Sequence, residues 1–563
     1  MLYKTFKMSN IDYFWDFFVS KGITNIFGLP GGAISALLSK TPNSISWVNT
    51  GHELQDGFVA STYGYYTNNV GLLFVTTGPG IATALSSYKN AEAENYPLII
   101  ISTFNPLGLE DDFQWWNINQ ISNTIGNLFY IENNFQFIKG LNDAYNLAKT
   151  KNIGVVLLIN INILDKMIKV PTINPIMKQL EKSILTKYAK SVVNEINQRF
   201  TGKNTLIVLG KGKFIDYNIV KDFILRNNLP YVTTWKQRYV IPGAVYCGRL
   251  GTLGHHSANY AVIRASHILV IGDYSGAVKT DYYENKFTFK KLNKKSIVYS
   301  LVNRKICASA YSNKYFVVNN LDNILSKLNI IPNNEWINTL NNSNTQLLVD
   351  LPRISQLEKY IYSASQAYKN NSLTIPVTCG VGNHWYALGK YMDITEPNCF
   401  ESTTNWSSIG IGLANGIGIH YATNKPVWIF EGDGGFTFSA STFLYLLANP
   451  NLPLTITITS DKTYSALTQN YLMKNYIDNS SNYVPFNEWN TLLPNSITFT
   501  NETDYYNYLN ENPVSDKVRY IILLIDNSDM MGSNVFEINY SLEYINYAKK
   551  NDFTNMINQQ LIY

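Results

Sequence analysis

The sequence predicts an α/β protein built from three doubly wound, parallel-sheet domains. Short apolar strands alternate with helical patterns almost throughout the chain, which is typical of parallel sheets. At 563 residues the chain is also too long for a single hydrophobic core. We expect an N-terminal domain over residues 1–170, a central domain over 183–340, a C-terminal domain over 350–530 and a tail over 534–563.

The N-terminal domain is expected to begin with an amphipathic helix starting near Ser9. A glycine-rich turn follows its first strand, and a helix follows Gly80. A polar connector is expected over 166–182. The strands predicted for this domain are 23–28, 71–76, 97–102 and 154–160.

The central domain is expected to start with a helix over 188–199 and a strand over 204–209, and to end at an Asn- and Pro-rich connector over 330–345. In the third domain, the apolar runs 426–430 and 454–459 predict strands, and a helix is expected over 439–448. Ligands of such sheets bind beyond the carboxyl ends of the strands, so the loops there are the places to look for a site.

Composition excludes several classes of protein. With 45% hydrophobic and 15% charged residues and a net charge of +5, the chain is an ordinary globular protein without the basic stripe that nucleic acid needs. Its four cysteines show no CxxC spacing, so we expect buried free thiols. No apolar run is long enough to span a membrane, and the first residues lack the pattern of a signal peptide. The expected location is the cytoplasm.

Asp433 is the first candidate ligand, because Gly432-Asp433-Gly434-Gly435 follows a predicted strand and precedes a predicted helix. A carboxylate there would share a divalent metal with a phosphate group bound at the turn. The alternative is an aspartate that only caps a helix. The neighbouring strand ends in Ser460-Asp461-Lys462, and two parallel strands that each end in an oxygen ligand bring both to one Mg²⁺.

This pair resembles the metal site of the thiamine diphosphate enzymes of the acetolactate synthase, pyruvate decarboxylase and benzoylformate decarboxylase type. The resemblance implies that Mg²⁺ is bound by Asp433, Asp461 and the carbonyl of Thr463. The family has two asparagines where this chain has Ser460-Asp461. The second carboxylate adds negative charge beside the diphosphate, so cofactor affinity should depend more strongly on a bound metal.

Further motifs extend the resemblance over nearly the whole chain. Residues 27–33 (FGLPGGA), 77–80 (TGPG), 381–384 (VGNH) and 407–410 (SSIG) resemble the family's cofactor loops, and the first is nearest to the acetolactate synthase form. Thr83 stands where the family usually has asparagine. The implied cofactor-binding residues are Gly31, Gly32, Pro79, Val381, Gly382, Asn383, His384, Ser407, Ile409, Gly432, Gly434, Gly435, Tyr464 and Ser465.

Glu53, in Gly51-His52-Glu53, stands at the position of the family's catalytic glutamate. Such a carboxyl shares a proton with the cofactor's pyrimidine N1′ and promotes the imine that deprotonates thiazolium C2. Spacing alone would favour a surface glutamate instead. Ile409 is the implied wedge that folds the two cofactor rings together, and it is also compatible with a simple core isoleucine.

The resemblance implies decarboxylation of a 2-oxo acid such as pyruvate through an enamine. Residues 111–114 (DDFQ) resemble the DAFQ of acetolactate synthases and make Gln114 a catalytic candidate, which favours carboligation over simple decarboxylation. The synthases' arginine-rich stretch after IGxR is replaced by residues 271–278 (IGDYSGAV), so FAD is not expected. His255 and His256 are tempting acid-base groups, but we favour loop packing for both.

Glu53 and the metal ligands lie in different domains, and in this family the two parts of one site come from different subunits. A homodimer or a dimer of dimers is therefore implied. The alternative to an active enzyme is a catalytically degenerate member with a structural or interaction role, suggested by Asp461, Thr83 and the missing arginines.

Overall fold

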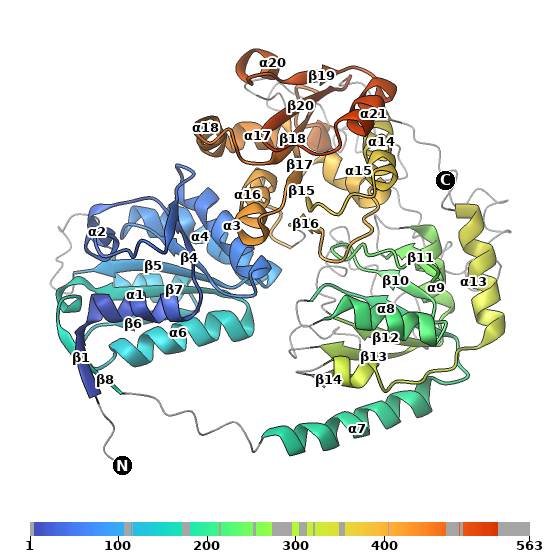
Figure 1. Cartoon of the computed structure of the whole chain (residues 1–563), viewed down its shortest axis with the longest axis horizontal. Helices are drawn as coiled ribbons and strands as arrows, with labels where there is room; N and C mark the ends of the chain where they lie inside the picture. The colour runs from blue at the N-terminus through green and yellow to red at the C-terminus, as the bar shows by residue number, and fades with distance from the viewer. Residues whose placement is uncertain are drawn as a thin grey trace.

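The computed structural model describes residues 5–105, 114, 116–171, 181–212, 215–250, 255–272, 295–302, 312–318, 321–347, 355–403, 405–468, 484 and 488–526. Three six-stranded sheets organise this part of the chain, and every strand pair within them is parallel. With helices packed around each sheet (Figure 1), this confirms the predicted fold class. The boundaries of the three domains stay predictions.

The N-terminal unit has the strand order β3-β2-β4-β5-β7-β6. Helix α1 (Asn10–Ser20) begins at its N-cap Ser9, whose hydroxyl accepts the amide of Asp12, as the sequence predicted. The strands are β2 (Asn25–Gly28), β3 (Ser46–Val48), β4 (Gly71–Phe74), β5 (Leu98–Phe104), β6 (Leu128–Ile131) and β7 (Gly154–Asn160). The other helices are η1 (Gly32–Ile34), α2 (Ser35–Leu38), α3 (Glu53–Tyr66), α4 (Pro79–Glu94), α5 (Ile118–Thr124), α6 (Phe137–Lys151) and η2 (Ile161–Ile163).

The central unit has the strand order β11-β10-β9-β12-β13-β14. Its strands are β9 (Thr205–Leu209), β10 (Tyr231–Thr233), β11 (Tyr246–Arg249), β12 (His267–Ile271), β13 (Ile297–Val302) and β14 (Lys314–Val317). Its helices are α7 (Glu181–Phe200), α8 (Tyr217–Arg226), α9 (His256–Arg264), α12 (Asp322–Leu325) and α13 (Asn334–Leu347).

The C-terminal unit has the strand order β16-β15-β17-β18-β20-β19. Its strands are β15 (Val377–Cys379), β16 (Phe400–Ser402), β17 (Val427–Gly432), β18 (Leu454–Ser460), β19 (Ile497–Phe499) and β20 (Arg519–Leu524). Its helices are α14 (Gln356–Asn370), α15 (Asn383–Tyr391), α16 (Ile411–Thr423), α17 (Asp433–Phe438), α18 (Ala440–Ala448), α20 (Trp489–Leu492) and α21 (Glu502–Glu511).

Two segments expected to be connectors contain regular structure. Part of 166–182 forms β8 (Met167–Pro171), which pairs antiparallel with β1 (Thr5–Ser9), and the helix predicted over 188–199 already begins at Glu181. Most of 330–345 lies in α13, where Trp336 and Leu340 are four residues apart and both buried. The abundant Asn residues hid this helical spacing.

The N- and C-terminal units share one hydrophobic core through helices α3 and α16, which lie side by side in Figure 1. A β-carbon on Gly418 of α16 would lie 2.6 Å from the carbonyl oxygen of Val59 on α3, so only glycine allows this approach. The hydroxyl of Thr62 donates to Asn415 Oδ1 at 2.8 Å across the same interface. The two units are therefore held together by close helix packing.

Candidate cofactor site

Asp433 lies at the carboxyl end of a buried central strand. β17 ends at Gly432, which is the N-cap of α17, and Asp433 is the first residue of that helix. The carboxylate is 2% exposed. Its Oδ2 accepts the amide of Lys462 at 2.8 Å and the hydroxyl of Ser460 at 3.1 Å. Asp433 is thus bound directly to the loop after β18.

Asp461 follows the adjacent parallel strand, and its Oδ1 accepts the amide and the hydroxyl of Thr463 at 3.0 and 3.1 Å. Burial and, to a smaller extent, the negative charge of Asp461 raise the pKa of Asp433 to about 7. Desolvation also raises the pKa of Asp461, whose side chain is half-buried. Two neighbouring carboxylates that repel each other are a donor set whose repulsion a hard divalent cation would relieve.

The described residues contain no group of three or more His, Cys, Asp or Glu side chains able to hold a metal. This suits Mg²⁺, which uses one or two protein carboxylates and takes its other oxygens from phosphate and water. The residues present therefore fit a magnesium diphosphate, with two side-chain ligands supplied by Asp433 and Asp461.

Glycines line the turn around Asp433. A β-carbon on Gly434 would lie 2.4 Å from the ring of Tyr464, and one on Gly432 would lie 3.2 Å from the ring of His384. Gly382, which follows Val381, is the N-cap of α15, whose first residue Asn383 donates to Ser465 Oγ at 3.1 Å. The structure thus joins the 381–384, 432–435 and 461–465 segments, and the α15 N-terminus favours an anion there.

Glu431 is a buried acid of this region that the sequence analysis missed. β-Carbons on Gly380, Gly412 and Gly435 would all lie within 2.6 Å of its carboxylate oxygens. Burial raises the pKa of Glu431 to about 8, and burial lowers the pKa of His384 to about 4. Glu431 Oε1 and His384 Nε2 are 3.9 Å apart. The sequence contained a signal for this buried acid, because Glu431 lies near the end of an apolar strand and is followed by several glycines.

The segment that carries Ser407 and Ile409 leads into α16. Ser407 has a φ of +56°, in the left-handed region that few non-glycine residues adopt. Ile409 is partly exposed and precedes Gly410, the N-cap of α16. The carbonyl of Gly410 accepts the hydroxyl of Ser439 at 2.7 Å. This contact places Ile409 beside the junction of α17 and α18.

Glu53 is the first residue of α3, where the ring of His52 accepts the amide of Leu54 at 3.2 Å. Its side chain is half-buried. A β-carbon on Gly80 would lie 3.5 Å from Glu53 Oε1, so the carboxylate lies against the start of α4. The structure therefore brings Glu53 to the TGPG loop, whose Pro79 is the first residue of α4.

Gln114 covers the other side of that loop. Its Oε1 accepts the hydroxyl of Thr76 at 2.7 Å, and a β-carbon on Gly78 would lie 2.6 Å from its carbonyl oxygen. A β-carbon on Gly31 would lie 2.8 Å from Thr76 Cβ, whereas one on Gly32 would have nothing within 4 Å. Glu53, Gln114 and Gly31 thus lie around one loop, whereas no contact places Gly32 there.

Within one chain, Glu53 and Ile409 lie at opposite ends of the α3–α16 pair. The contacts of Thr62 with Asn415 and of Val59 with Gly418 show that the helices run antiparallel. The stretch of α3 from Glu53 to Thr62 and the stretch from Asn415 back to Ile409 together measure roughly 20 Å along the helix axes, at a rise of about 1.5 Å per residue. A β-carbon on Gly51, two residues before Glu53, would nevertheless lie 3.4 Å from Ser441 Cβ, so the loop before α3 reaches the start of α18, whose N-cap Ser439 contacts Gly410.

His255 lies in a packed loop of the central unit. Its Nδ1 accepts the amide of Arg249 at 3.1 Å, and burial together with the Arg249 charge lowers its pKa to about 3. These contacts agree with loop packing. Residues 111–113, 273–278 and the tail 534–563 lie outside the described residues, as do the side chain of His256 and all of Cys307.

The other cysteines, Cys247, Cys379 and Cys399, are buried free thiols, as expected. Among the described residues, no helix is long and apolar enough to cross a membrane.

Three parallel-sheet units, an aspartate pair at adjacent strand ends and a glycine-lined turn form an arrangement that fits an α/β protein with a phosphate-containing cofactor. Residues 8–124 match the thiamine pyrophosphate enzyme N-terminal TPP binding domain, and residues 380–495 match the corresponding C-terminal TPP binding domain. The two matches support placing the chain in the thiamine diphosphate-dependent enzyme superfamily.

Relatives in this superfamily include acetolactate synthases. The acetolactate synthase large subunit of Lactococcus lactis is 24% identical over 445 residues, covering 74% of this chain and 74% of that protein. Acetolactate synthase of Bacillus subtilis is 21% identical over 506 residues, covering 82% of each chain. The isozyme 1 large subunit of Escherichia coli is 21% identical over 448 residues, covering 76% of this chain and 77% of that protein.

Proposed function

We propose that this protein is a thiamine diphosphate- and Mg²⁺-dependent enzyme that decarboxylates a 2-oxo acid such as pyruvate and transfers the remaining fragment to a second carbonyl, as an acetolactate synthase does. The observation that carries the proposal is the pair formed by the buried Asp433 and the half-buried Asp461 at the ends of β17 and β18, with the glycine turn around it. The acetolactate synthase relatives support the choice of reaction.

Each part of the chain has a role in this proposal. Asp433 and Asp461 hold Mg²⁺ on the diphosphate, together with the carbonyl of Thr463, and the α15 N-terminus donates amides to it. Ile409 would support the folded arrangement of the two cofactor rings, while the carbonyl of Ser407 would accept a hydrogen bond from the cofactor's amine. When bound, thiamine diphosphate supplies the nucleophilic carbon and accepts the electrons left by CO₂.

Glu53 holds the proton at the pyrimidine nitrogen, and the TGPG loop beside it packs against the ring. Gln114 is hydrogen-bonded to Thr76 and lies against this loop. From there it would orient the 2-oxo acid substrate or the second carbonyl compound that accepts the fragment. Because the two parts of one site come from different subunits in the thiamine diphosphate enzymes that this chain resembles, we propose that the protein acts as a homodimer in which Glu53 serves the cofactor of its partner. The arginine-poor 271–278 segment gives no support for FAD.

The test combines cofactor binding with turnover. Calorimetry with thiamine diphosphate and Mg²⁺ should show saturable binding, and pyruvate should then release CO₂. Glu53→Gln should lower turnover by about 100-fold or more, because it removes an acid-base group, while Glu511→Gln on the exposed end of α21 should leave it unchanged.

An absence of saturable binding would favour the second candidate, a degenerate family member with a structural role. The replacement of the family's asparagine by Asp461 is the observation that keeps this candidate open.

A further inference from the structure

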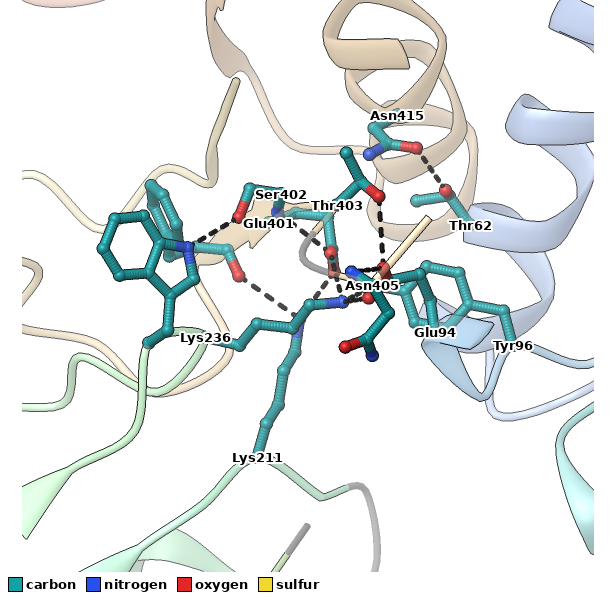
Figure 2. A network of polar contacts seen from close by, with 12 residues as sticks. Thr62, Glu94, Tyr96, Lys211, Lys236, Glu401, Ser402, Thr403, Asn405 and Asn415 are labelled. Atoms are coloured by element: carbon teal, nitrogen blue, oxygen red, sulfur yellow. Dashed lines mark hydrogen bonds and ion pairs between the residues drawn. The ribbon is translucent and has the colours of Figure 1, made fainter. Parts of the chain in front are cut away.

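A buried network of alternating charges lies where the three units meet (Figure 2). Lys236 Nζ is 2.5 Å from Glu94 Oε2 and 3.4 Å from Glu401 Oε1, and Lys211 Nζ is 2.6 Å from Glu401 Oε2. None of these four side chains is more than 8% exposed. Glu94 comes from the N-terminal unit, both lysines from the central unit and Glu401 from β16 of the C-terminal unit.

The ion pairs keep the network charged in spite of its burial. Burial alone would lower the pKa of Lys236, but the negative charges of Glu401 and Glu94 raise this pKa above its ordinary value. Burial opposes the ionisation of Glu401 as well, yet Lys211 and Lys236 lower its pKa to about 2. Two cations and two anions balance, so the junction is electrically neutral as a whole.

Glu94 differs from the other members because its second oxygen faces a turn of the chain. Oε1 accepts the amide of Asn405 at 2.6 Å, the hydroxyl of Thr403 at 3.1 Å and the amide of Trp406 at 3.3 Å. The side chain of Asn405 donates in return to the carbonyl of Ala93 at 2.7 Å. One oxygen of the Glu94 carboxylate thus accepts hydrogen bonds from Thr403, Asn405 and Trp406, while the other oxygen pairs with Lys236.

The turn leads directly to the segment that carries Ser407 and Ile409. The amide of Ser407 donates to Thr403 Oγ1 at 2.9 Å, so a continuous path of hydrogen bonds runs from Glu94 through Thr403 to Ser407. Ser407 has a left-handed backbone, which costs energy for a residue with a β-carbon and persists only where neighbours hold it. Glu94 and Thr403 are the neighbours that do so.

We propose that Glu94 is a positioning residue, which sets the orientation of Ser407 and Ile409 toward the cofactor by holding the preceding turn. The role rests on the proposed function, in which these two residues touch the cofactor rings. Glu94 acts through the turn and makes no contact with substrate itself.

Two variants test the role in the full chain. Glu94→Ala removes the carboxylate, and Thr403→Val removes only the hydroxyl between Glu94 and Ser407 while every ion pair stays in place. The matched control is Lys211→Met/Glu401→Leu, which deletes the ion pairs of Glu401 with Lys211 and with Lys236 and leaves the Lys236–Glu94 pair and the hydrogen bonds of Glu94 in place. Glu94→Asp is the conservative variant, expected to recover part of the loss.

The first readout needs no cofactor. Hydrogen exchange of the backbone amides of 405–407 should accelerate at least tenfold in Glu94→Ala and Thr403→Val, and by less than twofold in the control. The second readout is thiamine diphosphate affinity with saturating Mg²⁺, which should weaken at least tenfold in both variants and less than twofold in the control.

The outcomes separate this role from a general effect on folding. If Glu94→Ala does not fold, Thr403→Val alone decides. Equal losses in the control and in Glu94→Ala, with Thr403→Val unchanged, would overturn the positioning role and leave Glu94 as part of a domain junction. If the wild type binds the cofactor and both variants bind it equally well, only the positioning role fails. If the wild type binds none, the proposed function fails with it.

Discussion

At the scale of single residues, Asp461 has the clearest consequence for cofactor binding. Its half-buried carboxylate lies close enough to the buried carboxylate of Asp433 to raise the pKa of Asp433. A diphosphate bound between them adds more negative charge, so the metal must offset an unusually large repulsion.

We predict that Asp461→Asn makes thiamine diphosphate binding less dependent on Mg²⁺. Removing one negative charge near the diphosphate should improve affinity at limiting Mg²⁺ by about 1–2 kcal/mol, which is roughly tenfold. Titrating the cofactor at several Mg²⁺ concentrations measures this. Asp516→Asn, on the exposed surface, is the control. An equal Mg²⁺ requirement in Asp461→Asn and the wild type would contradict the charge argument.

Single residues were predictable where a motif has a fixed place relative to a strand. The positions of Asp433, Asp461 and Glu53 at element ends follow from the apolar runs before them. Glu431 had a signal in the glycines that follow it, but its full burial was not predictable, because it depends on Gly380 and Gly412, which reach it only through the fold. The roles of all these residues stay predictions.

At the scale of elements, the N-terminal end of α3 contains a second buried acid, Asp56. It is fully buried, and its Oδ1 accepts the amide and the hydroxyl of Thr50, each at 2.8 Å. Burial raises the pKa of Asp56 from its ordinary value to about 7, with hydrogen bonds from Thr50 opposing the shift. Glu53 adds a smaller raising effect.

This shift predicts a pH-dependent stability. A carboxyl whose pKa is higher in the folded state binds its proton more tightly there, so it contributes stability at acid pH that is lost as pH rises from about 4 to about 7. The loss is about 1.4 kcal/mol per pH unit. Asp56→Asn keeps the acceptor for Thr50 without a titrating group, so its stability relative to wild type should rise by about 3–4 kcal/mol between pH 4 and pH 8.

Denaturant unfolding of the cofactor-free protein at pH 4, 6 and 8 measures this difference. The exposed Asp516→Asn should track the wild type at each pH. A constant gap between wild type and Asp56→Asn across this range would show that Asp56 is already ionised at acid pH, against the burial argument.

Elements were predictable where their periodicity was clean. Both ends of the strand over 154–160 and the start of α1 near its N-cap were predicted correctly, because local residues determine where these elements begin and end. Helix α13 was missed because its polar composition resembles a connector, and strand β8 was missed because it is short and only its pairing with β1 reveals it. Their stability comes from tertiary contacts such as the indole of Trp336 donating to the carbonyl of Thr205.

At the scale of the whole molecule, the sequence predicts three sheets but not how they meet. Lys236 pairs with Glu94 across 142 positions of sequence, and Lys211 pairs with Glu401 across 190. No periodic pattern links charges so far apart. The same limit applies to the proposed dimer, because even the antiparallel packing of α3 against α16 emerges only from the fold.

The proposed dimer predicts complementation between two inactive variants. In a heterodimer of Glu53→Gln and Asp433→Asn chains, one site receives both defects and the other receives none, so a doubly tagged, co-expressed heterodimer should show about half the wild-type activity. A site contained in one chain would leave that heterodimer inactive, since each chain carries a defect. The reciprocal heterodimer pairs a wild-type chain with a chain that carries both substitutions. Shared sites make it inactive, whereas single-chain sites leave it half active, so the two heterodimers must give opposite results and each arrangement is excluded by one of them.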